Sequence, residues 1–335
     1  MNPLGTAPMR KLFAAAALAM TVFVSFSSQA AEAVRIGYWT SGVSLGYGSV
    51  LEAKDFLAKR GIDATFVHFP DVNAPIRALA AGSIDLAFGA PVAGVFSAAA
   101  EGVPIKIFAA TQPADVQFVV PADSPIKSVA EFKGKKIGMS PTGSSVAVIA
   151  GTVLAGNYGI QPTDFSLIGG NESRLAQFLS QKQVDGAALR SLTIDQLDDE
   201  LKVKRLGSFA DEWKKLTKTD AVPYIGVGAV NAKLVDEHPE TVAKVIAALR
   251  DTLAWGASHH DEVVGILEKS ANLPTKDARV YVGLWNAMNR VSFEPADIET
   301  LKLQHKVFIE GGLVKGALKD DLFATKPYAE SKNLK

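Results

Sequence analysis

The clearest fold signal is Arg77-Ala78-Leu79-Ala80-Ala81-Gly82-Ser83-Ile84-Asp85-Leu86-Ala87, a helix that passes through a Gly-Ser turn into an apolar strand. Asn73-Ala74-Pro75 predicts where that helix begins, with Asn73 as N-cap and Pro75 inside the first turn. The strand over residues 84–88 is continuous and apolar except for Asp85. A strand of this kind, directly after a helix, is typical of a sheet covered on both faces.

The same pattern recurs downstream. A predicted helix runs from Arg174 through Leu179 and leads into Val184-Asp185-Gly186-Ala187-Ala188, again an apolar-Asp-small strand. The two aspartates, Asp85 and Asp185, stand 100 residues apart. Helix-turn-strand units are common enough to recur by chance, but we interpret the pair as two lobes built on one plan.

The flanking sequence alternates short apolar strands with helices, which predicts an α/β protein. The expected strands are 33–38, 62–69, 84–88, 105–110, 135–139 and 184–189. The expected helices are 46–60, 73–82, 91–101, 144–157 and 172–182, followed by a mostly helical region from Asn231 with helices at 239–257, 261–270, 276–290 and 295–310. Two segments, 111–117 and 221–226, are expected to cross between the lobes.

Composition narrows the class of protein. The chain has 335 residues, and its 48% apolar and 21% charged content is that of a folded protein. Lys plus Arg equals Asp plus Glu at 35 each, whereas a nucleic-acid binder would show a basic excess. The sequence contains no cysteine, which excludes disulfides, thiolate chemistry and a lipidated cysteine.

The first thirty residues are predicted to be a cleaved secretory signal peptide. Arg10 and Lys11 precede an uncharged, mostly apolar run over 12–26, and Ser28-Gln29-Ala30 has the small residues of a cleavage site. The alternative, a membrane anchor, needs about 20 apolar residues. Removal of this segment leaves 33 basic and 35 acidic residues, a nearly neutral periplasmic protein.

The sequence shows no catalytic or metal-binding motif, so we expect no catalytic residue, no bound metal and no cofactor. The five histidines have no metal-ligand spacing, and the adjacent His259 and His260 are expected at the surface. His68 and Asp71 are the only plausible acid–base couple, and a structural role is the favoured alternative.

Loops at strand ends are where an open α/β sheet binds ligands, and several here suit an anion. They are Trp39-Thr40-Ser41-Gly42, Asp71-Val72-Asn73, Gly89-Ala90-Pro91 and Ser140-Pro141-Thr142-Gly143-Ser144-Ser145. The last opens into a helix, whose free N–H groups and dipole favour negative charge. In the alternative, Thr142 or Ser144 is simply an N-cap.

Three side chains are candidates for contacts with a ligand held by these loops. Arg190 ends a strand and is a natural fork for an acidic group, unless it is a surface residue paired with Asp195 or Asp198. Trp39 and Tyr224 could wall the pocket, or could simply pack in the core.

Several stretches resemble the periplasmic solute-binding proteins of the sulfonate, taurine, nitrate and thiamine-precursor importers. They are Arg35–Tyr38, Ile76–Asp85, Glu131–Gly138 with the Thr142–Ser145 loop, Val184–Ala187, and Asn231 through Glu240. The resemblance implies the two-lobe periplasmic-binding-protein type II fold, with residues 34–115 plus 223–335 in one lobe and 116–222 in the other. It also implies delivery of a small solute to an inner-membrane ATP-driven permease, by a monomer that binds no nucleic acid.

The resemblance also implies ligand contacts. In taurine-binding members the corresponding helix-start loop takes the sulfonate, which maps onto Thr142, Gly143, Ser144 and Ser145. Two positions depart from those members: Arg190 replaces a Trp, and Gly226 replaces the Asp that binds the amine. We therefore expect a small organic anion, a sulfonate or carboxylate, without a fixed positive charge and with a second acidic group possible at Arg190.

Two alternatives share this fold. Related pyrimidine-precursor enzymes use histidine chemistry, but here the histidines are scattered. A ligand-presenting sensor protein would have the same architecture and would differ only in its receptor.

Overall fold

The computed structural model describes residues 31–197 and 202–334. The predicted signal peptide, residues 1–30, lies outside the described residues. Among the residues that are described, no helix combines the length and the apolar character needed to cross a bilayer.

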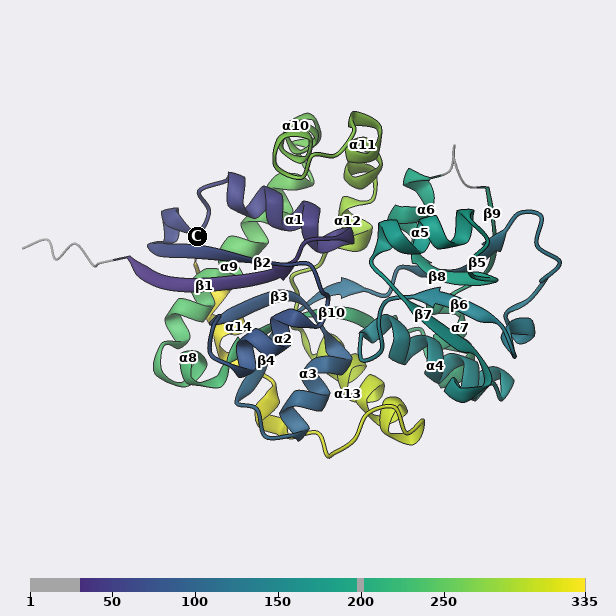
Figure 1. Ribbon diagram of the computed structural model, residues 1–335. Helices are drawn as coiled ribbons and strands as arrows, with labels where there is room; N and C mark the ends of the chain where they lie inside the picture. The colour runs from purple at the N-terminus through teal and green to yellow at the C-terminus, as the bar shows by residue number, and fades with distance from the viewer. Residues whose placement is uncertain (1–30, 198–201, 335) are drawn as a thin grey trace, which may run out of the picture. The chain divides into compact units, whose positions relative to one another are not determined.

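The first sheet has the strand order β2-β1-β3-β10-β4. Its strands are β1 (Glu32–Trp39), β2 (Ile62–Phe69), β3 (Leu86–Pro91), β4 (Ile105–Pro113) and β10 (Tyr224–Asn231). The strand β1 runs parallel to β2 and β3, whereas β10 is antiparallel to β3 and β4. The last strand therefore enters this sheet from a distant part of the chain (Figure 1).

The second sheet repeats this arrangement in the order β7-β6-β8-β5-β9. Its strands are β5 (Val116–Pro121), β6 (Lys136–Met139), β7 (Ser166–Gly169), β8 (Gly186–Arg190) and β9 (Val203–Ser208). The strand β6 is parallel to β7 and β8, and β5 is antiparallel to β8 and β9. We call each sheet with the helices on it a lobe. The lobe boundaries after residues 115 and 222 stay a prediction.

The two aspartates of the repeated stretch make equivalent contacts. The Asp85 carboxylate accepts a hydrogen bond from the backbone N–H of Arg35 at 2.8 Å, and that of Asp185 accepts one from the N–H of Lys136 at 2.7 Å. Each aspartate also donates its own N–H to the carbonyl of that same partner. The prediction of two lobes built on one plan is thus confirmed, because each Asp aligns its strand with the first parallel strand of its sheet.

Helices cover the sheets. The helices before β10 are α1 (Gly42–Ala53), α2 (Ala74–Ala80), α3 (Val92–Ala100), α4 (Ser145–Tyr158), α5 (Glu172–Ser180), α6 (Ser191–Gln196) and α7 (Phe209–Thr217). After β10 come α8 (Ala232–Glu237), α9 (Pro239–Gly256), α10 (His260–Ser270), α11 (Thr275–Gly283), α12 (Trp285–Met288), α13 (Pro295–Glu310) and α14 (Thr325–Ser331). The predicted helical character of the chain beyond Asn231 is confirmed, and α9 packs on α1 and α14 beside the first sheet (Figure 1).

The structure corrects several element boundaries. The helix expected over 46–60 is α1, which begins at Gly42 and ends at Ala53, because Lys54 is extended. Glycine is needed within α1, since a Cβ on Gly46 would lie 2.3 Å from the Tyr281 ring. The helix expected over 276–290 is divided into α11 and α12 at Leu284.

The strand expected over 84–88 was placed too early. The observed strand β3 covers 86–91, because residues 84–85 lead into the sheet through the contacts of Asp85. Gly89, Ala90 and Pro91 are therefore the carboxyl end of a strand and not a loop.

Candidate functional site

The lobes meet where the parallel strands of both sheets end. Two hydrogen bonds join them there: Asn73 Nδ2 donates to the Thr142 carbonyl at 3.2 Å, and the Ala93 N–H donates to Ser145 Oγ at 3.2 Å. Ala93 is in the first turn of α3, directly after Pro91, and Ser145 opens α4. The structure thus brings together the predicted loops around Asn73, Ala90–Pro91 and Thr142–Ser145.

The amino end of α4 is an N-capped helix start that lies at the seam between the lobes. Ser144 is its N-cap and accepts a hydrogen bond from the Ala147 N–H at 3.2 Å, as the N-cap alternative predicted. Gly143 has a φ of +85°, a conformation that favours glycine and turns the chain into the helix. Ser144 and Ser145 are buried at the seam between the lobes. The first N–H groups of a helix have no partner within it and carry its positive dipole end.

Asn73 does not cap α2 with its side chain, contrary to the prediction. Its backbone is helical, and its own N–H donates to Asp71 Oδ1 at 2.7 Å. The amide side chain instead reaches the other lobe at Thr142, which leaves the buried Oδ1 atom without a hydrogen-bond partner. Pro75 does lie in the first turn of α2, as predicted.

The loop after β1 supplies an aromatic wall. Trp39 is buried, and its indole Nε1–H donates to the Pro70 carbonyl at 3.2 Å. The Thr40 hydroxyl is engaged too, donating to the Phe69 carbonyl at 3.1 Å. The Trp39 ring faces the second lobe, with the Arg190 guanidinium carbon 5.0 Å from its centroid. A cation over an indole face at this distance is an attractive pair.

Arg190 is buried, so the alternative of a surface residue is wrong, and its role as a fork for an acidic ligand stays a prediction. It is 5% exposed, and its Nη1 donates to Glu172 Oε1 in a short ion pair. Asp195, one of the expected partners, instead pairs with Arg205 at 2.7 Å, and Asp198 lies outside the described residues. The Arg190 Nε atom is buried without a hydrogen-bond partner.

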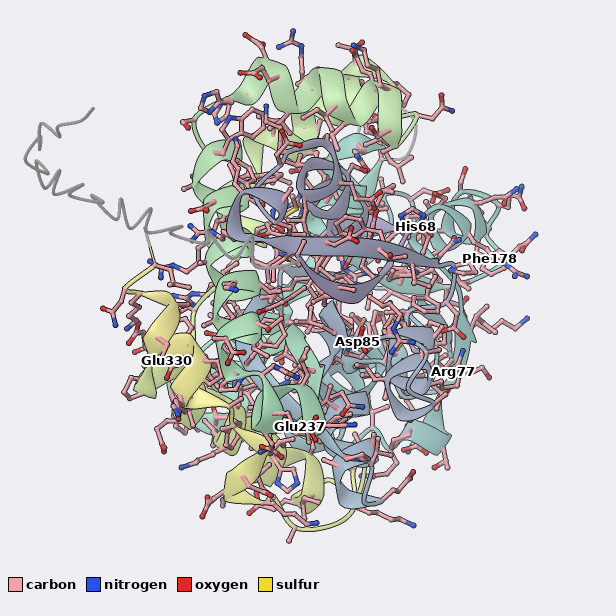
Figure 2. All side chains as sticks on the ribbon, turned by 90° about the vertical axis from the view of Figure 1, so that its left-hand side faces the viewer. His68, Arg77, Asp85, Phe178, Glu237 and Glu330 are labelled. Atoms are coloured by element: carbon pink, nitrogen blue, oxygen red, sulfur yellow. The ribbon has the colours of Figure 1, made fainter. Side chains whose placement is uncertain are left out.

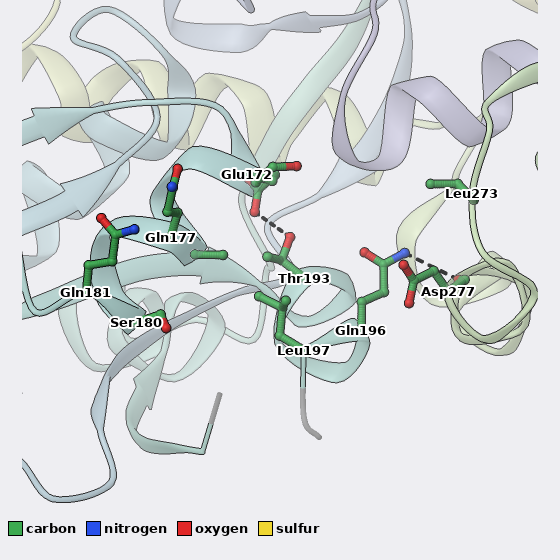
Figure 3. A pocket seen from close by; sticks show the side chains of 11 residues that line it. Glu172, Gln177, Ser180, Gln181, Thr193, Gln196, Leu197, Leu273 and Asp277 are labelled. Atoms are coloured by element: carbon green, nitrogen blue, oxygen red, sulfur yellow. Dashed lines mark hydrogen bonds between the residues drawn. The ribbon is translucent and has the colours of Figure 1, made fainter. Parts of the chain in front are cut away.

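A cavity of about 410 Å³ opens beside Glu172 (Figure 3). Its walls come from α5 and α6 of the second lobe and, across from them, from Leu273 and Asp277 near α11. Glu172 and Thr193 form part of the lining, and Gln196 Nε2 donates across the lobes to the Asp277 carbonyl at 3.3 Å.

Gln112, which the sequence analysis did not single out, lies beside Gly226 and Gly89. It is buried, and its Nε2 donates to Ser44 Oγ at 2.9 Å. A Cβ on Gly226 would lie 2.7 Å from Gln112 Oε1, so the glutamine amide fills the space that a side chain at 226 would occupy. Gly89, with a φ of +64°, lies on the other side of the same amide.

The hydroxyl of Tyr224 is directed into the first lobe. It donates to Asp297 Oδ1 at 2.5 Å and accepts from Arg290 Nη1 at 3.1 Å. Burial, then the hydrogen bond and charge of Asp297, raise the pKa of Tyr224 far above that of a free tyrosine. The structure therefore does not join Tyr224 to the cluster around Arg190, and its hydroxyl stabilises the contact between β10 and α13.

The acid–base couple suggested by the sequence does not form. His68 Nε2 lies 2.7 Å from Glu52 Oε1, whereas Asp71 pairs with Arg77 at 2.9 Å. Figure 2 shows His68 and Arg77 apart from each other. Within residues 31–197 and 202–334, no group of three or more His, Asp or Glu side chains is placed to hold a metal ion.

Comparison with known proteins gives matches over most of the chain. A family model described as NMT1/THI5 like matches residues 50–263. A Brucella abortus protein named as a binding protein is 26% identical over 80% of this chain and 82% of its own length. An Escherichia coli (strain K12) protein named as an aliphatic sulfonates-binding protein is 26% identical over 91% of this chain and 92% of its own.

Solved structures share the fold. The alkanesulfonate-binding protein SsuA from Xanthomonas axonopodis pv. citri, bound to MOPS, is similar with a TM-score of 0.71 at 21% identity, over 87% of this chain and 96% of that one. The desulfurization enzyme DSZB is also similar, with a TM-score of 0.60 at 15% identity, over 90% of this chain and 99% of the enzyme. The fold therefore occurs in both binding proteins and enzymes.

Proposed function

Because the chain belongs to the NMT1/THI5-like family, we propose that it is the periplasmic substrate-binding protein of an ATP-driven importer. It captures a small organic anion between its two lobes and presents the closed form to the permease. Residues 34–115 plus 223–335 move against residues 116–222, and the signal peptide over residues 1–30 directs export. The name of the Escherichia coli relative supports a sulfonate as the ligand class.

One observation carries the proposal: the amino end of α4 and the buried Arg190 both lie at the seam between the lobes. Backbone N–H groups and hydroxyls of Thr142–Ser145 suit a sulfonate or carboxylate, and Arg190 Nε adds a donor. Trp39, whose ring lies against the Arg190 guanidinium, forms an apolar wall next to that group. These groups favour an anion with an uncharged remainder.

Closure follows from contacts on both sides of the ligand. A ligand that touches both lobes binds the closed form better than the open form, and this difference in affinity shifts the population. Closure also removes water, which strengthens the charge-assisted hydrogen bonds to the anion. The bonds from Asn73 and Ala93 to the second lobe add to the closed state.

Calorimetry with ethanesulfonate and taurine tests the proposal. The two ligands share the sulfonate, but taurine carries an ammonium, for which Gly226 and the Gln112 amide offer no carboxylate. We expect ethanesulfonate to bind at least about tenfold more tightly, the equivalent of one lost charge-assisted contact. Tighter binding of taurine would contradict the ligand class. If no sulfonate or carboxylate binds at all, the binding function itself is wrong.

A further inference from the structure

Glu172 is a buried carboxylate that pairs with Arg190, a residue of the site proposed for an anion. Its Oε1 accepts from Arg190 Nη1, and its Oε2 accepts from Thr193 Oγ1 at 2.6 Å. Both carboxylate oxygens are thus held by the second lobe, and the residue is only 5% exposed. The carboxylate is therefore fixed in place and shielded from solvent.

The first lobe covers this ion pair. A Cβ on Gly42 would lie 3.6 Å from Glu172 Cγ and 3.6 Å from Arg190 Cδ, and the Trp39 ring stands over the guanidinium. Counter-ions screen exposed charges over about 8–10 Å but reach such a covered pair far less. Any charge added to or removed from this cluster therefore acts strongly on a ligand next to it.

Resting on the proposed function, we infer that Glu172 determines the charge of the ligand, selecting organic anions with one acidic group over those with two. The Glu172 carboxylate cancels the charge of Arg190, so the guanidinium offers a ligand its free Nε–H but no net charge. The single acidic group binds at the amino end of α4. A second acidic group near Arg190 would find no net positive charge to offset the loss of its own hydration.

The variant Glu172→Gln tests this inference. Glutamine keeps the size of the side chain and an acceptor for Thr193, but it removes the negative charge. Glu212→Gln is the matched control, because Glu212 is also a buried carboxylate of the second lobe but its partners are Asn157 and Tyr158, not an arginine. Calorimetry compares ethanesulfonate with 1,2-ethanedisulfonate on each protein.

We expect the wild type and Glu212→Gln to prefer the monosulfonate. In Glu172→Gln, the affinity ratio should move at least about tenfold toward the disulfonate, since the net charge of the pair changes from zero to the positive charge of Arg190. An unchanged ratio would overturn the inference and leave the proposed function intact.

A second measurement does not depend on sulfonate transport. Inorganic sulfate should raise the melting temperature of Glu172→Gln, through the uncompensated Arg190, by more than it raises that of the wild type or the control. A sulfate effect no larger than that of the wild type would contradict the role of Glu172. If no organic anion binds to the wild type, the proposed function fails, whereas the sulfate experiment still decides whether Glu172 neutralises the site.

The double variant Glu172→Gln/Arg190→Met covers the case in which the single variant does not fold. It replaces a neutral pair by a neutral pair, so the ratio of the two sulfonate affinities should stay within about threefold of the wild type. A selective loss of about tenfold or more in disulfonate affinity would show that Arg190 acts as a free cation, and would refute the inference.

Discussion

Breaking the Arg190–Glu172 pair should cost more stability than removing it altogether. In Arg190→Met the side chain keeps much of its volume beneath Trp39, but the Glu172 carboxylate, 7% exposed, loses its cation. A buried charge left without its partner costs about 3–5 kcal/mol. In Arg190→Met/Glu172→Gln no charge remains, and the loss should shrink to about 1–2 kcal/mol, mainly the attraction to the Trp39 face.

Urea unfolding followed by far-ultraviolet circular dichroism measures the difference. At a slope near 3 kcal/mol per M, the midpoint of Arg190→Met should fall by about 1 M or more, and that of the double variant by about half as much or less. The second substitution would therefore restore stability. A double variant as unstable as Arg190→Met would refute the reasoning, because it would show that packing and not charge holds this part of the second lobe.

Three further predictions concern the hydrogen bonds between the lobes, the space beside Gly226 that Gln112 fills, and the repeated aspartate Asp85. Asn73→Ala and Ser145→Ala each remove one hydrogen bond between the lobes. Each should weaken ethanesulfonate binding about fivefold in calorimetry, while the urea midpoint of unfolding barely moves. Unchanged affinity would show that these bonds do not support closure. Gly226→Ala places a Cβ 2.7 Å from the Gln112 amide oxygen and should lower the free energy of unfolding by about 1–3 kcal/mol. If this clash causes the loss, the additional substitution Gln112→Ala should partly restore stability in urea unfolding. Burial would raise the pKa of Asp85, but the hydrogen bonds and charge of Arg35 outweigh burial and hold the pKa below its ordinary value. Asp85 therefore stabilises the fold above about pH 4 and loses that contribution as pH falls through the lowered pKa. Asp85→Asn should be less stable by about 1–2 kcal/mol at pH 7 and equal to the wild type near pH 2, and an equal loss at both pH values would contradict this role of Asp85.

Features that depend on residues close together in the chain could be predicted from the sequence. The stretch over residues 77–87 and its counterpart over 174–188 were identifiable because a helix, a turn and an apolar strand with one aspartate follow each other along the chain. The N-cap of α4 at Ser144 was predictable for the same reason, since a hydroxyl before a helix bonds to a nearby N–H. The strand β5 (Val116–Pro121) was not predicted. Only its first two residues fall in the expected crossing segment 111–117, and its partners β8 and β9 lie far along the chain.

Contacts between distant residues decided the character of the site. The sequence by itself determined two similar α/β halves and an anion-suited loop at residues 142–145, because propensity, capping and hydrophobic pattern act over a few residues. Only the tertiary structure decided that Glu172 neutralises Arg190 and that Gln112 fills the space beside Gly226. Ion pairs and packing depend on which elements fold against one another. The separation of 18 positions between Glu172 and Arg190, or of 114 positions between Gln112 and Gly226, does not carry that information.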